Sequence, residues 1–591
     1  MSALPENAEA VVFAAPSRDA ADGATSTGLL SLRRFVTQSR IWVAALFACA
    51  VAEAMAQTGS WLLVRVAIND GIVAHRAQTL DLALAAFAAV SVAGWVLQAI
   101  VTRGMARLGQ EIVLGLRREL FDHLTTLSLR YFSEQRAGWI IARLTSDLDA
   151  VSDVLSQGLP TIVTSCALLP AAVAALLIND WRLGLAALVV LPPALVLSHW
   201  FQRASTRAQL DVRNRIAGVT AHVAESVAGM AVVQSFLRER SFMARFDELN
   251  GANQSANVYA QRIASVFFPS IELLGVVATA AVLAVGADLL PATQIGTIAA
   301  AYFLLSLAFQ PLQSLSEVYS QLQSGQAAMV KVASVLDERP DILSPSPARA
   351  SGRLDGTLRF QNVRFAYGSN EVLHGIDLTV PEGACYAIVG ESGGGKSTLA
   401  KLAARFYDPS AGAVTVDGID LRALDLRDYR RQLGVVLQDQ FLFSGTIADN
   451  VRFAAPEADD DELERICSLV GVDAIAARFA DGLGHQIREG GSGLSSGERQ
   501  LISIARALLA DPRILIFDEA TSNIDRPTEL LIERALDRLL HGRTSIIIAH
   551  RIATARRARQ IIVIERGQIV QRGTEAELLA VDGVFRRLAA S

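Results

Sequence analysis

The sequence predicts a multi-pass α-helical membrane domain of about six spans, followed by an α/β domain with a largely parallel sheet. The chain has 591 residues, which is too many for a single hydrophobic core. It is 51% hydrophobic and 19% charged, with a mean hydropathy of +0.34, and this is too apolar for an ordinary soluble protein. The long apolar segments precede residue 336, whereas short strands alternate with helical stretches after it.

Charge, cysteine usage and the N-terminal stretch narrow the class further. A net charge of −5 argues against a nucleic-acid-binding protein, which normally carries a basic excess or patch. The four cysteines are scattered and form neither metal-ligand pairs nor a disulfide framework. Residues 1–28 lack the basic-then-apolar order of a secretory signal, and we expect them to be a disordered cytosolic tail.

Six long apolar segments recur in the predicted membrane domain, residues 29–335. Each approaches or exceeds the roughly 20 residues that a helix needs to cross the hydrocarbon core. Buried core helices are the alternative interpretation, but so many long segments in succession disfavour it. The segments are Ile41–Val66, Leu80–Val101, Thr161–Ile178, Leu183–Trp200, Ile263–Leu290 and Ile295–Leu315.

The connections between these segments predict the topology. The links near Asn69–Thr79, Asn179–Arg182 and Leu290–Thr293 are short, whereas the two intervening connections are long, polar and helical in pattern. Arginines precede the first segment and fill the first long connection, so the positive-inside rule makes these sides cytoplasmic. We therefore expect helices that extend into the cytosol from a plasma membrane of bacterial type, with the N-terminus and the second domain also cytoplasmic.

Two carboxylates lie inside predicted spans. A charge at mid-membrane costs about 2.5 to 3.5 kcal/mol even on lenient insertion scales, so lipid exposure is unfavourable. One hypothesis is that Glu53 and Glu272 face a central pathway. The alternative is that each lies near an interface, or is neutralised by protonation or by a neighbour such as Gln57.

The second domain begins after a linker. Residues 336–355 are rich in Pro, Ser and Gly, a composition typical of linkers. In residues 356–591 short apolar runs such as "LRFQNVRFAY", "CYAIVG" and "ILIFDE" alternate with helical stretches. That alternation favours an α/β domain.

The stretch "CYAIVGESGGGKSTLAKLAARF" contains a strand, a glycine-rich loop and a helix start, and Gly390–Thr398 fits the phosphate-binding pattern G-x-x-x-x-G-K-S. Backbone N–H groups of such a loop surround phosphates, and the helix dipole adds to the attraction. Lys396 would neutralise the β- and γ-phosphates, and Ser397 would coordinate Mg²⁺. The expected binding residues are Gly390, Glu391, Ser392, Gly393, Gly394, Gly395, Lys396, Ser397 and Thr398.

Further along, "RILIFDEATS" is an apolar strand that ends in two carboxylates. Asp518 is placed to hold Mg²⁺ through water, and Glu519 to polarise an attacking water. An acidic pair exposed to solvent is the alternative, but "SIIIAH" is a second buried strand that delivers His550 to the same sheet edge.

In their order these motifs resemble the ATP-binding cassette family of exporter type, with one membrane domain fused to one nucleotide-binding domain. The resemblance runs from about Leu29 to the C-terminus. It implies that Tyr367 stacks on adenine, Gln438 senses Mg²⁺ and water, Asp525 is the D-loop aspartate, His550 is the switch histidine, and Leu494, Ser495, Ser496, Gly497 and Glu498 form the signature.

The resemblance also explains why "GLSSGERQ" provides a second anion-binding helix start. In this family two cassettes pack head to tail, so the phosphate loop of one faces the signature of the other across a shared ATP. Ser495 would cap the helix, and the N–H groups of Ser496 and Gly497 would donate to the γ-phosphate. Coupling helices are expected within Tyr131–Gly138 and Glu225–Phe236.

The signature departs from the family pattern at Ser496, in place of Gly, and at Glu498, in place of Gln. The Cβ of Ser496 would crowd the phosphate. The carboxylate of Glu498 would lie near the triphosphate and either repel it or accept hydrogen bonds from ribose hydroxyls. Because Glu519 and His550 match the pattern, we expect a second, related half-transporter as the partner, so that a heterodimer is favoured over a homodimer.

The predicted function is ATP-driven export of an apolar or amphipathic small molecule or lipid across the membrane, with ATP and Mg²⁺ as cofactors and membrane lipid as surroundings. An importer of siderophore-like or vitamin-like cargo on the same fold is an alternative. A nucleotide-gated regulator without pumping is another, although the intact Glu519 and His550 favour turnover.

Overall fold

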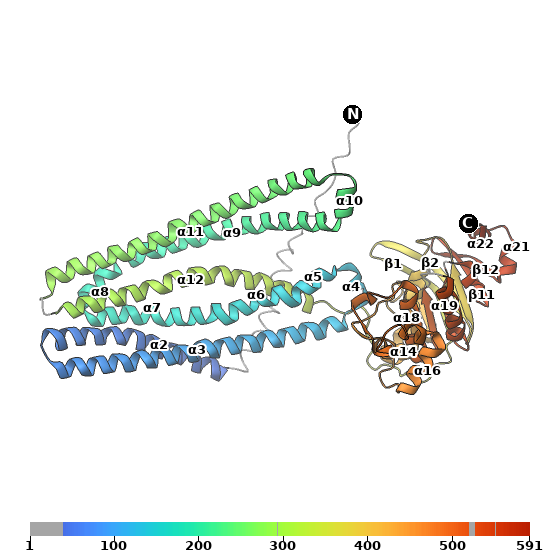
Figure 1. The fold of residues 1–591 in the computed structure, drawn as a ribbon, viewed down its shortest axis with the longest axis horizontal. Coiled ribbons are helices and arrows are strands. Elements are labelled where there is room, and N and C mark those ends of the chain that lie inside the picture. The colour runs from blue at the N-terminus through green and yellow to red at the C-terminus, as the bar shows by residue number, and fades with distance from the viewer. Residues whose placement is uncertain (1–39, 292–293, 519–525, 550, 591) are drawn as a thin grey trace, which may run out of the picture. The chain divides into compact units, whose positions relative to one another are not determined.

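The structure is a computed structural model that describes residues 40–291, 294–518, 526–549 and 551–590. The chain divides into two compact units (Figure 1). The first contains the chain up to Thr125 together with Ala137–Glu338, and the second contains Thr126–Arg136 together with Arg339–Ser591.

The first unit is built from helices, and its α-helices are labelled in Figure 1. They are α2 (Arg40–Val66), η1 (Ala67–Val73), α3 (Ala77–Thr126), α5 (Ala137–Ala142), η2 (Arg143–Asp147), α6 (Leu148–Asp153), η3 (Val154–Gly158), α7 (Leu159–Asn179), α8 (Trp181–Leu188), α9 (Leu191–Ala228), α10 (Met230–Ser235), α11 (Glu239–Leu289) and α12 (Ile295–Leu336).

The predicted spans are confirmed as parts of much longer helices. Within the described residues, five helical stretches are long and apolar enough to cross a membrane: Ile41–Val73, Ala77–Thr126, Ala137–Asn179, Trp181–Ala228 and Glu239–Asp288. The sixth predicted span lies in α12, which is apolar over Ile295–Pro311 and has 42 residues in all. Since α3 alone has 50 residues, it is about 75 Å long, well beyond the thickness of the hydrocarbon core.

Interhelical packing in this unit joins segments that are far apart in sequence. α12 packs against α7 and α2, and α11 packs against α9. Between α9 and α11 the rings of Phe201 and Phe267 stack with centroids 4.0 Å apart. Offset aromatic stacking of this kind adds to the burial of apolar area.

The three short links are tied together by polar side chains. Asn69 accepts a hydrogen bond from the N–H of Gly296 at 2.7 Å and donates to Thr297 at 3.0 Å. Asn179 donates to the carbonyl of Thr297 at 2.9 Å, and its own carbonyl accepts from Arg65 at 3.1 Å. The ends of three helical hairpins are therefore joined by side-chain hydrogen bonds that no local sequence pattern predicts.

The two intramembrane carboxylates have different surroundings. Glu53 is only 4% exposed and accepts a hydrogen bond from Gln57, one turn away, at 3.0 Å. Glu272 is exposed on α11. Glu53 therefore has the neighbour that the alternative names, and the hypothesis that the two carboxylates face a central pathway stays a prediction.

Short helices occur in both expected coupling segments, α4 (Leu129–Glu134) and α10. α10 connects α9 to α11 in the first unit, but α4 belongs to the second unit by its contacts. Arg130 pairs with Asp341 at 3.4 Å, and Ser133 lies 3.3 Å from the hydroxyl of Tyr407. The sequence places this segment within the membrane domain, whereas long-range contacts assign it to the second unit.

The second unit contains the strands β1 (Leu358–Tyr367), β2 (Asn370–Val380), β3 (Cys385–Val389), β4 (Ala411–Val416), β5 (Ile419–Asp420), β6 (Leu433–Val436), β7 (Gly445–Thr446), β8 (Gln486–Ile487), β9 (Ile514–Asp518), β10 (Thr544–Ile548), β11 (Gln560–Glu565) and β12 (Gln568–Gly573). Its helices are α13 (Lys396–Ala403), η5 (Leu421–Ala423), α14 (Leu426–Arg431), α15 (Ile447–Arg452), α16 (Asp460–Val470), α17 (Val472–Ala476), η6 (Gly482–Gly484), η7 (Glu489–Gly491), α18 (Ser496–Leu509), α19 (Arg526–Leu540), α20 (Ile552–Ala555), α21 (Glu575–Ala580) and α22 (Val584–Ala590).

The sheets confirm the α/β class of this unit. A six-stranded sheet has the order β12-β11-β3-β10-β9-β6, and only the β11–β12 pair in it is antiparallel. A four-stranded antiparallel sheet has the order β2-β1-β4-β5. β9 and β10 are buried along their whole length, as expected of central parallel strands covered on both faces.

Successive residues of β9 face two different cores. Leu515 and Phe517 pack in one cluster with α16, α18 and α19, whereas Ile514 and Ile516 pack in the other with β1, β2 and α13. This alternation follows from the two-residue period of a strand. It fixes the end of β9, and with it Asp518, between the two layers.

A buried arginine fastens the linker to the second unit. Arg405 is 2% exposed, donates to the carbonyls of Leu343 and Leu424 at 3.0 and 3.3 Å, and pairs with Asp408 at 3.2 Å. Leu343 lies in the linker between α12 and β1, so this one side chain joins the linker to the loop after α13.

We expect Arg405→Leu to lower the melting temperature of the second unit by about 6–12 °C. Losing a buried charge pair costs about 3 kcal/mol, and each kcal/mol shifts a domain of this size by about 2–4 °C. Differential scanning calorimetry of the full-length protein in detergent measures the shift. The matched control is Arg422→Leu, which breaks an exposed pair with Asp420; equal shifts for the two variants would contradict the assignment.

Candidate functional site

The predicted phosphate loop lies between β3 and α13. The Lys396 ammonium is buried, and it donates to the carbonyls of Gly390 and Glu391 at 2.9 and 2.8 Å. Burial lowers the pKa of Lys396, and the nearby carboxylate of Asp518 opposes that shift by favouring the charged form. The loop therefore holds the Lys396 ammonium in place, close enough to the Asp518 carboxylate for the two charges to attract each other.

Two of the loop glycines have no room for a side chain. At Gly390, where φ is +151°, a Cβ would lie 2.1 Å from the carbonyl oxygen of Ile564. At Gly395, where φ is +98°, it would lie 2.7 Å from Leu373 on β2. The loop can therefore keep its backbone N–H groups close to a ligand only because these positions are glycine.

The oxygen donors suit Mg²⁺. Ser397 is half-buried in the first turn of α13, and Asp518 is buried at the end of β9. Hydroxyl and carboxylate oxygens are the ligands that this hard cation prefers, with nucleotide phosphates and water completing its shell. Within the described ranges no group of three or more His, Cys, Asp or Glu could hold a metal by itself. The hydroxyl of Ser397 and the carboxylate of Asp518 fit an ion whose other ligands are phosphate oxygens and water.

The remaining catalytic residues are only partly described. Gln438 is exposed in the loop after β6, the strand beside β9. Glu519, Asp525 and His550 lie outside the described residues. The strands that precede Glu519 and His550, β9 and β10, pair in parallel with each other, and β10 also pairs with β3.

An aromatic group lies beside the phosphate loop. Tyr367 ends β1 with its side chain 37% exposed, and its ring contacts Phe365 and Tyr407 edge-on with centroids 4.8 and 5.4 Å away. The paired strand β2 touches Gly395 through Leu373. Tyr407, which also reaches Ser133 on α4, was missed by sequence reasoning, and its only signal was a second aromatic pair in "ARFYD".

The signature segment forms the start of α18, and the predicted cap is confirmed. Ser495 is the N-cap: its hydroxyl accepts from the N–H of Glu498 at 3.2 Å. Glu498 returns the contact by accepting from the N–H of Ser495 at 2.8 Å, which completes a capping box. Ser496 and Gly497 occupy the first turn, where backbone N–H groups have no intrahelical acceptor.

Glu498 has a partner that the sequence does not predict. The sequence places its carboxylate near a triphosphate, where it either repels the phosphates or accepts hydrogen bonds from ribose hydroxyls. In the structure the second carboxylate oxygen pairs with Arg478 at 2.6 Å. The spacing S-x-x-E was a sequence signal for the capping box, whereas Arg478 comes from a separate segment and had no signal.

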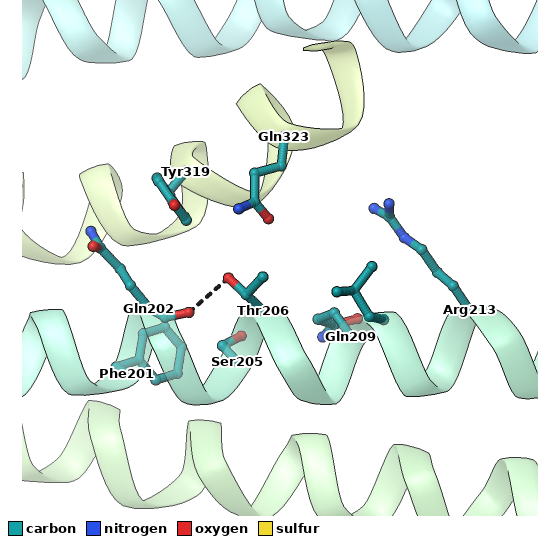
Figure 2. Close-up of a pocket in the computed structure, with 9 residues that line it drawn as sticks. Phe201, Gln202, Ser205, Thr206, Gln209, Arg213, Tyr319 and Gln323 are labelled. Carbon is teal, nitrogen blue, oxygen red and sulfur yellow. Dashed lines mark hydrogen bonds between the residues drawn. The ribbon is translucent and has the colours of Figure 1, made fainter. Parts of the chain in front are cut away.

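A small polar cavity occurs in the helical unit between α9 and α12 (Figure 2). Its volume of about 30 Å³ suits a single water. Thr206 donates to the carbonyl of Gln202 at 2.7 Å, and Arg213 donates to Ser324 at 2.5 Å. The lining residues are Phe201, Gln202, Ser205, Thr206, Gln209, Leu210, Arg213, Tyr319 and Gln323.

Two protein families match this chain. Residues 42–312 match the ABC transporter transmembrane region, and residues 373–522 match the ABC transporter family of ATP-binding domains. The first match covers most of the helical unit and includes the segment Thr126–Arg136, whose contacts are with the second unit, and the second match lies within the second unit.

Similar proteins share this fused organisation. The uncharacterized ABC transporter ATP-binding protein YknV of Bacillus subtilis is 37% identical over 489 residues, covering 82% of this chain and 81% of that protein. A fatty acid ABC transporter of Mycobacterium bovis is 36% identical, covering 86% and 80%. A multidrug efflux protein of Mycobacterium tuberculosis is 36% identical over 90% of this chain, which spans only 45% of that longer protein.

Among solved structures, a bacterial Atm1-family ABC exporter with ATP bound superposes with a TM-score of 0.75 and 26% identity, covering 95% of this chain and 98% of that one. The chain therefore belongs to the ABC transporter family, as an exporter-type half-transporter that binds and hydrolyses ATP, couples this to transport and works as a dimer.

Proposed function

We propose that this chain exports an amphipathic molecule from the cytosol, using ATP bound between its own phosphate loop and the signature of a partner cassette. The observation that carries the proposal is the presence, in one cassette, of a closed glycine loop around Lys396 and a capped helix start at Ser495. Each is one half of an anion site, and two cassettes arranged head to tail complete both halves.

The roles proposed within each site rest on the chemistry of Lys396, Ser397, Asp518 and Glu519 and, for Tyr367, Gln438, Asp525 and His550, on the family resemblance. Lys396 and the loop N–H groups hold the β- and γ-phosphates, and Tyr367 stacks on the adenine. Glu519 orients the attacking water, while His550 and Asp525 act at the γ-phosphate and at the interface between cassettes. Ser397 and Asp518, with Gln438, would hold Mg²⁺, whose charge neutralises the phosphates when it is bound.

Coupling to the helices is proposed to run through α4. Ser133 on α4 contacts Tyr407, and Tyr407 contacts the proposed adenine-stacking ring of Tyr367. A movement of Tyr367 on nucleotide binding would therefore be transmitted to α4 through the side chain of Tyr407. α10, on the other long connection, is the corresponding element for the partner cassette.

The side chains that line the cavity between α9 and α12, which has room for only one water in this structure, support a head-group contact for an amphipathic cargo. Its residues follow the apolar part of each helix, so the cavity lies at the proposed cytoplasmic end of the spans. Amide and hydroxyl groups with Arg213 suit a polar or anionic head group, and Phe201 and Leu210 suit an apolar part. A similar protein is named for fatty acids, molecules with both features.

We place the protein in the inner membrane of a bacterium, with the nucleotide-binding unit in the cytoplasm. The arginine-rich connections and the bacterial relatives support this orientation.

We propose that the partner is a related but different chain. Ser496 still places a Cβ where the family pattern has Gly, and this should weaken the site that the signature completes. The companion argument from Glu498 loses its force, because Arg478 already neutralises that carboxylate. The heterodimer proposal therefore rests on Ser496 alone.

Inside-out vesicles that contain the dimer should accumulate a fluorescent amphiphile when MgATP is added. The Glu519→Gln variant should lose ATP hydrolysis at least about a hundredfold while still binding ATP, because the amide keeps the shape but cannot orient the water. Parallel assays of uptake, phosphate release and ATP binding check this. A Glu519→Gln dimer that retains most of its hydrolysis would remove the assigned role.

Arg213→Ala should raise the concentration of an anionic amphiphile that gives half-maximal transport by about three- to tenfold, because a charge-assisted hydrogen bond is lost. A neutral amphiphile of the same chain length should be affected much less. The control is Arg215→Ala, which removes an exposed arginine of α9 that pairs with Asp211. Equal effects of the two variants, or of the two amphiphiles, would contradict the proposed head-group contact.

This chain purified without other transporter subunits should hydrolyse ATP slowly, and Ser496→Gly should raise the rate several-fold by removing the crowding at the phosphate. Light scattering in lipid nanodiscs, combined with phosphate release, measures both properties. A stable homodimer with vigorous hydrolysis that Ser496→Gly hardly changes would decide for the homodimer. Mass spectrometry of chains that copurify from the native host would identify a different partner.

A further inference from the structure

Glu498 joins the signature helix to a second segment. One carboxylate oxygen accepts from the N–H of Ser495 at 2.8 Å, and the other pairs with Arg478 at 2.6 Å. The Glu498 side chain is 14% exposed, whereas the Arg478 side chain is 52% exposed. The carboxylate is thus largely enclosed, and both of its oxygens are already engaged within this chain.

Arg478 is held on a fixed segment that follows α17. The next residue, Phe479, stacks flat on His485 with centroids 3.6 Å apart and an interplanar angle of 6°. The guanidinium of Arg478 lies 5.5 Å from the Phe479 ring, and α17 itself packs against α18. The Arg478 guanidinium therefore has a second contact, with Phe479, besides its ion pair with Glu498.

The arrangement has an electrostatic consequence for an incoming triphosphate. A helix N-terminus attracts anions, but a carboxylate in its first turn competes with a phosphate for that attraction and repels it. A guanidinium paired with the carboxylate cancels most of the repulsion at short range. It also keeps Glu498 turned back onto Ser495, so the capping box, and with it the Ser495 hydroxyl, stays in one orientation.

We propose that Arg478 is a positioning residue for the signature, which neutralises Glu498 and holds it in the capping box so that the helix start can receive the partner's ATP. The inference rests on the proposed function, in which the signature completes a nucleotide site across the dimer. It adds that this chain contacts the nucleotide through Ser495 and the first-turn N–H groups, and that the Glu498 carboxylate faces its own Arg478.

The test compares Arg478→Gln with Arg478→Gln/Glu498→Gln in the full-length dimer, reconstituted in nanodiscs with whichever partner the copurification identifies. Arg478→Gln should raise the KM for MgATP about fivefold, with kcat within about twofold of the wild type. A higher salt concentration should reduce the difference in KM between Arg478→Gln and the wild type, because salt screens the repulsion between the Glu498 carboxylate and the triphosphate. The double variant should recover most of the affinity, since a neutral amide in place of the Glu498 carboxylate needs no counter-charge, and Arg478→Lys should also retain it.

Arg465→Gln is the matched control, because it removes an exposed arginine of α16 that pairs with Glu462 at 3.6 Å, away from the signature. If Arg478→Gln raised the KM only because packing at position 478 was lost, the KM would stay raised in the double variant. An unchanged KM in Arg478→Gln, or a double variant as impaired as the single one, would overturn the inference while the proposed function stands. A wild-type dimer that hydrolyses no ATP would overturn both.

Discussion

The close packing around the glycine loop is the constraint on which the nucleotide-binding unit depends. Gly390 is pressed against the carbonyl of Ile564 on β11, and Gly395 against Leu373 on β2. The N–H of Gly567 donates to the carbonyl of Gly394 at 3.2 Å. Strands from both sheets therefore meet at one loop, so a substitution that shifts either sheet also shifts the phosphate-binding backbone.

The same unit contains a second helix start, at α18, whose residues differ in charge and capping from those at the start of α13. α13 begins with glycines and a buried lysine, which offer donors and positive charge to a phosphate. α18 begins with a reciprocal cap between Ser495 and Glu498, and its acidic member is balanced by Arg478. The start of α13 supplies positive charge, and the start of α18 supplies ordered N–H groups. This difference suits two surfaces that bind one nucleotide from opposite sides.

In the helical unit, hydrogen bonds between polar side chains fix the positions of the helices along one another, which apolar packing alone does not fix. Long apolar helices can slide along one another at little cost, because their surfaces are chemically uniform. Asn69, Asn179 and Thr297 fix the ends of the hairpins through hydrogen bonds, which are directional. At the other end the polar cavity between α9 and α12 interrupts the apolar surface (Figure 2).

The sequence by itself determined the spans, the α/β class, the phosphate loop and the cap at Ser495, because each depends on the spacing of residues that are close together in the chain. Only the tertiary structure decided that α4 belongs with the nucleotide-binding unit, that Arg405 binds Leu343 in the linker, and that Arg478 neutralises Glu498. These outcomes depend on which side chains meet after folding. An ion pair between distant segments leaves no periodicity in the sequence, since its strength depends on separation in space and on burial.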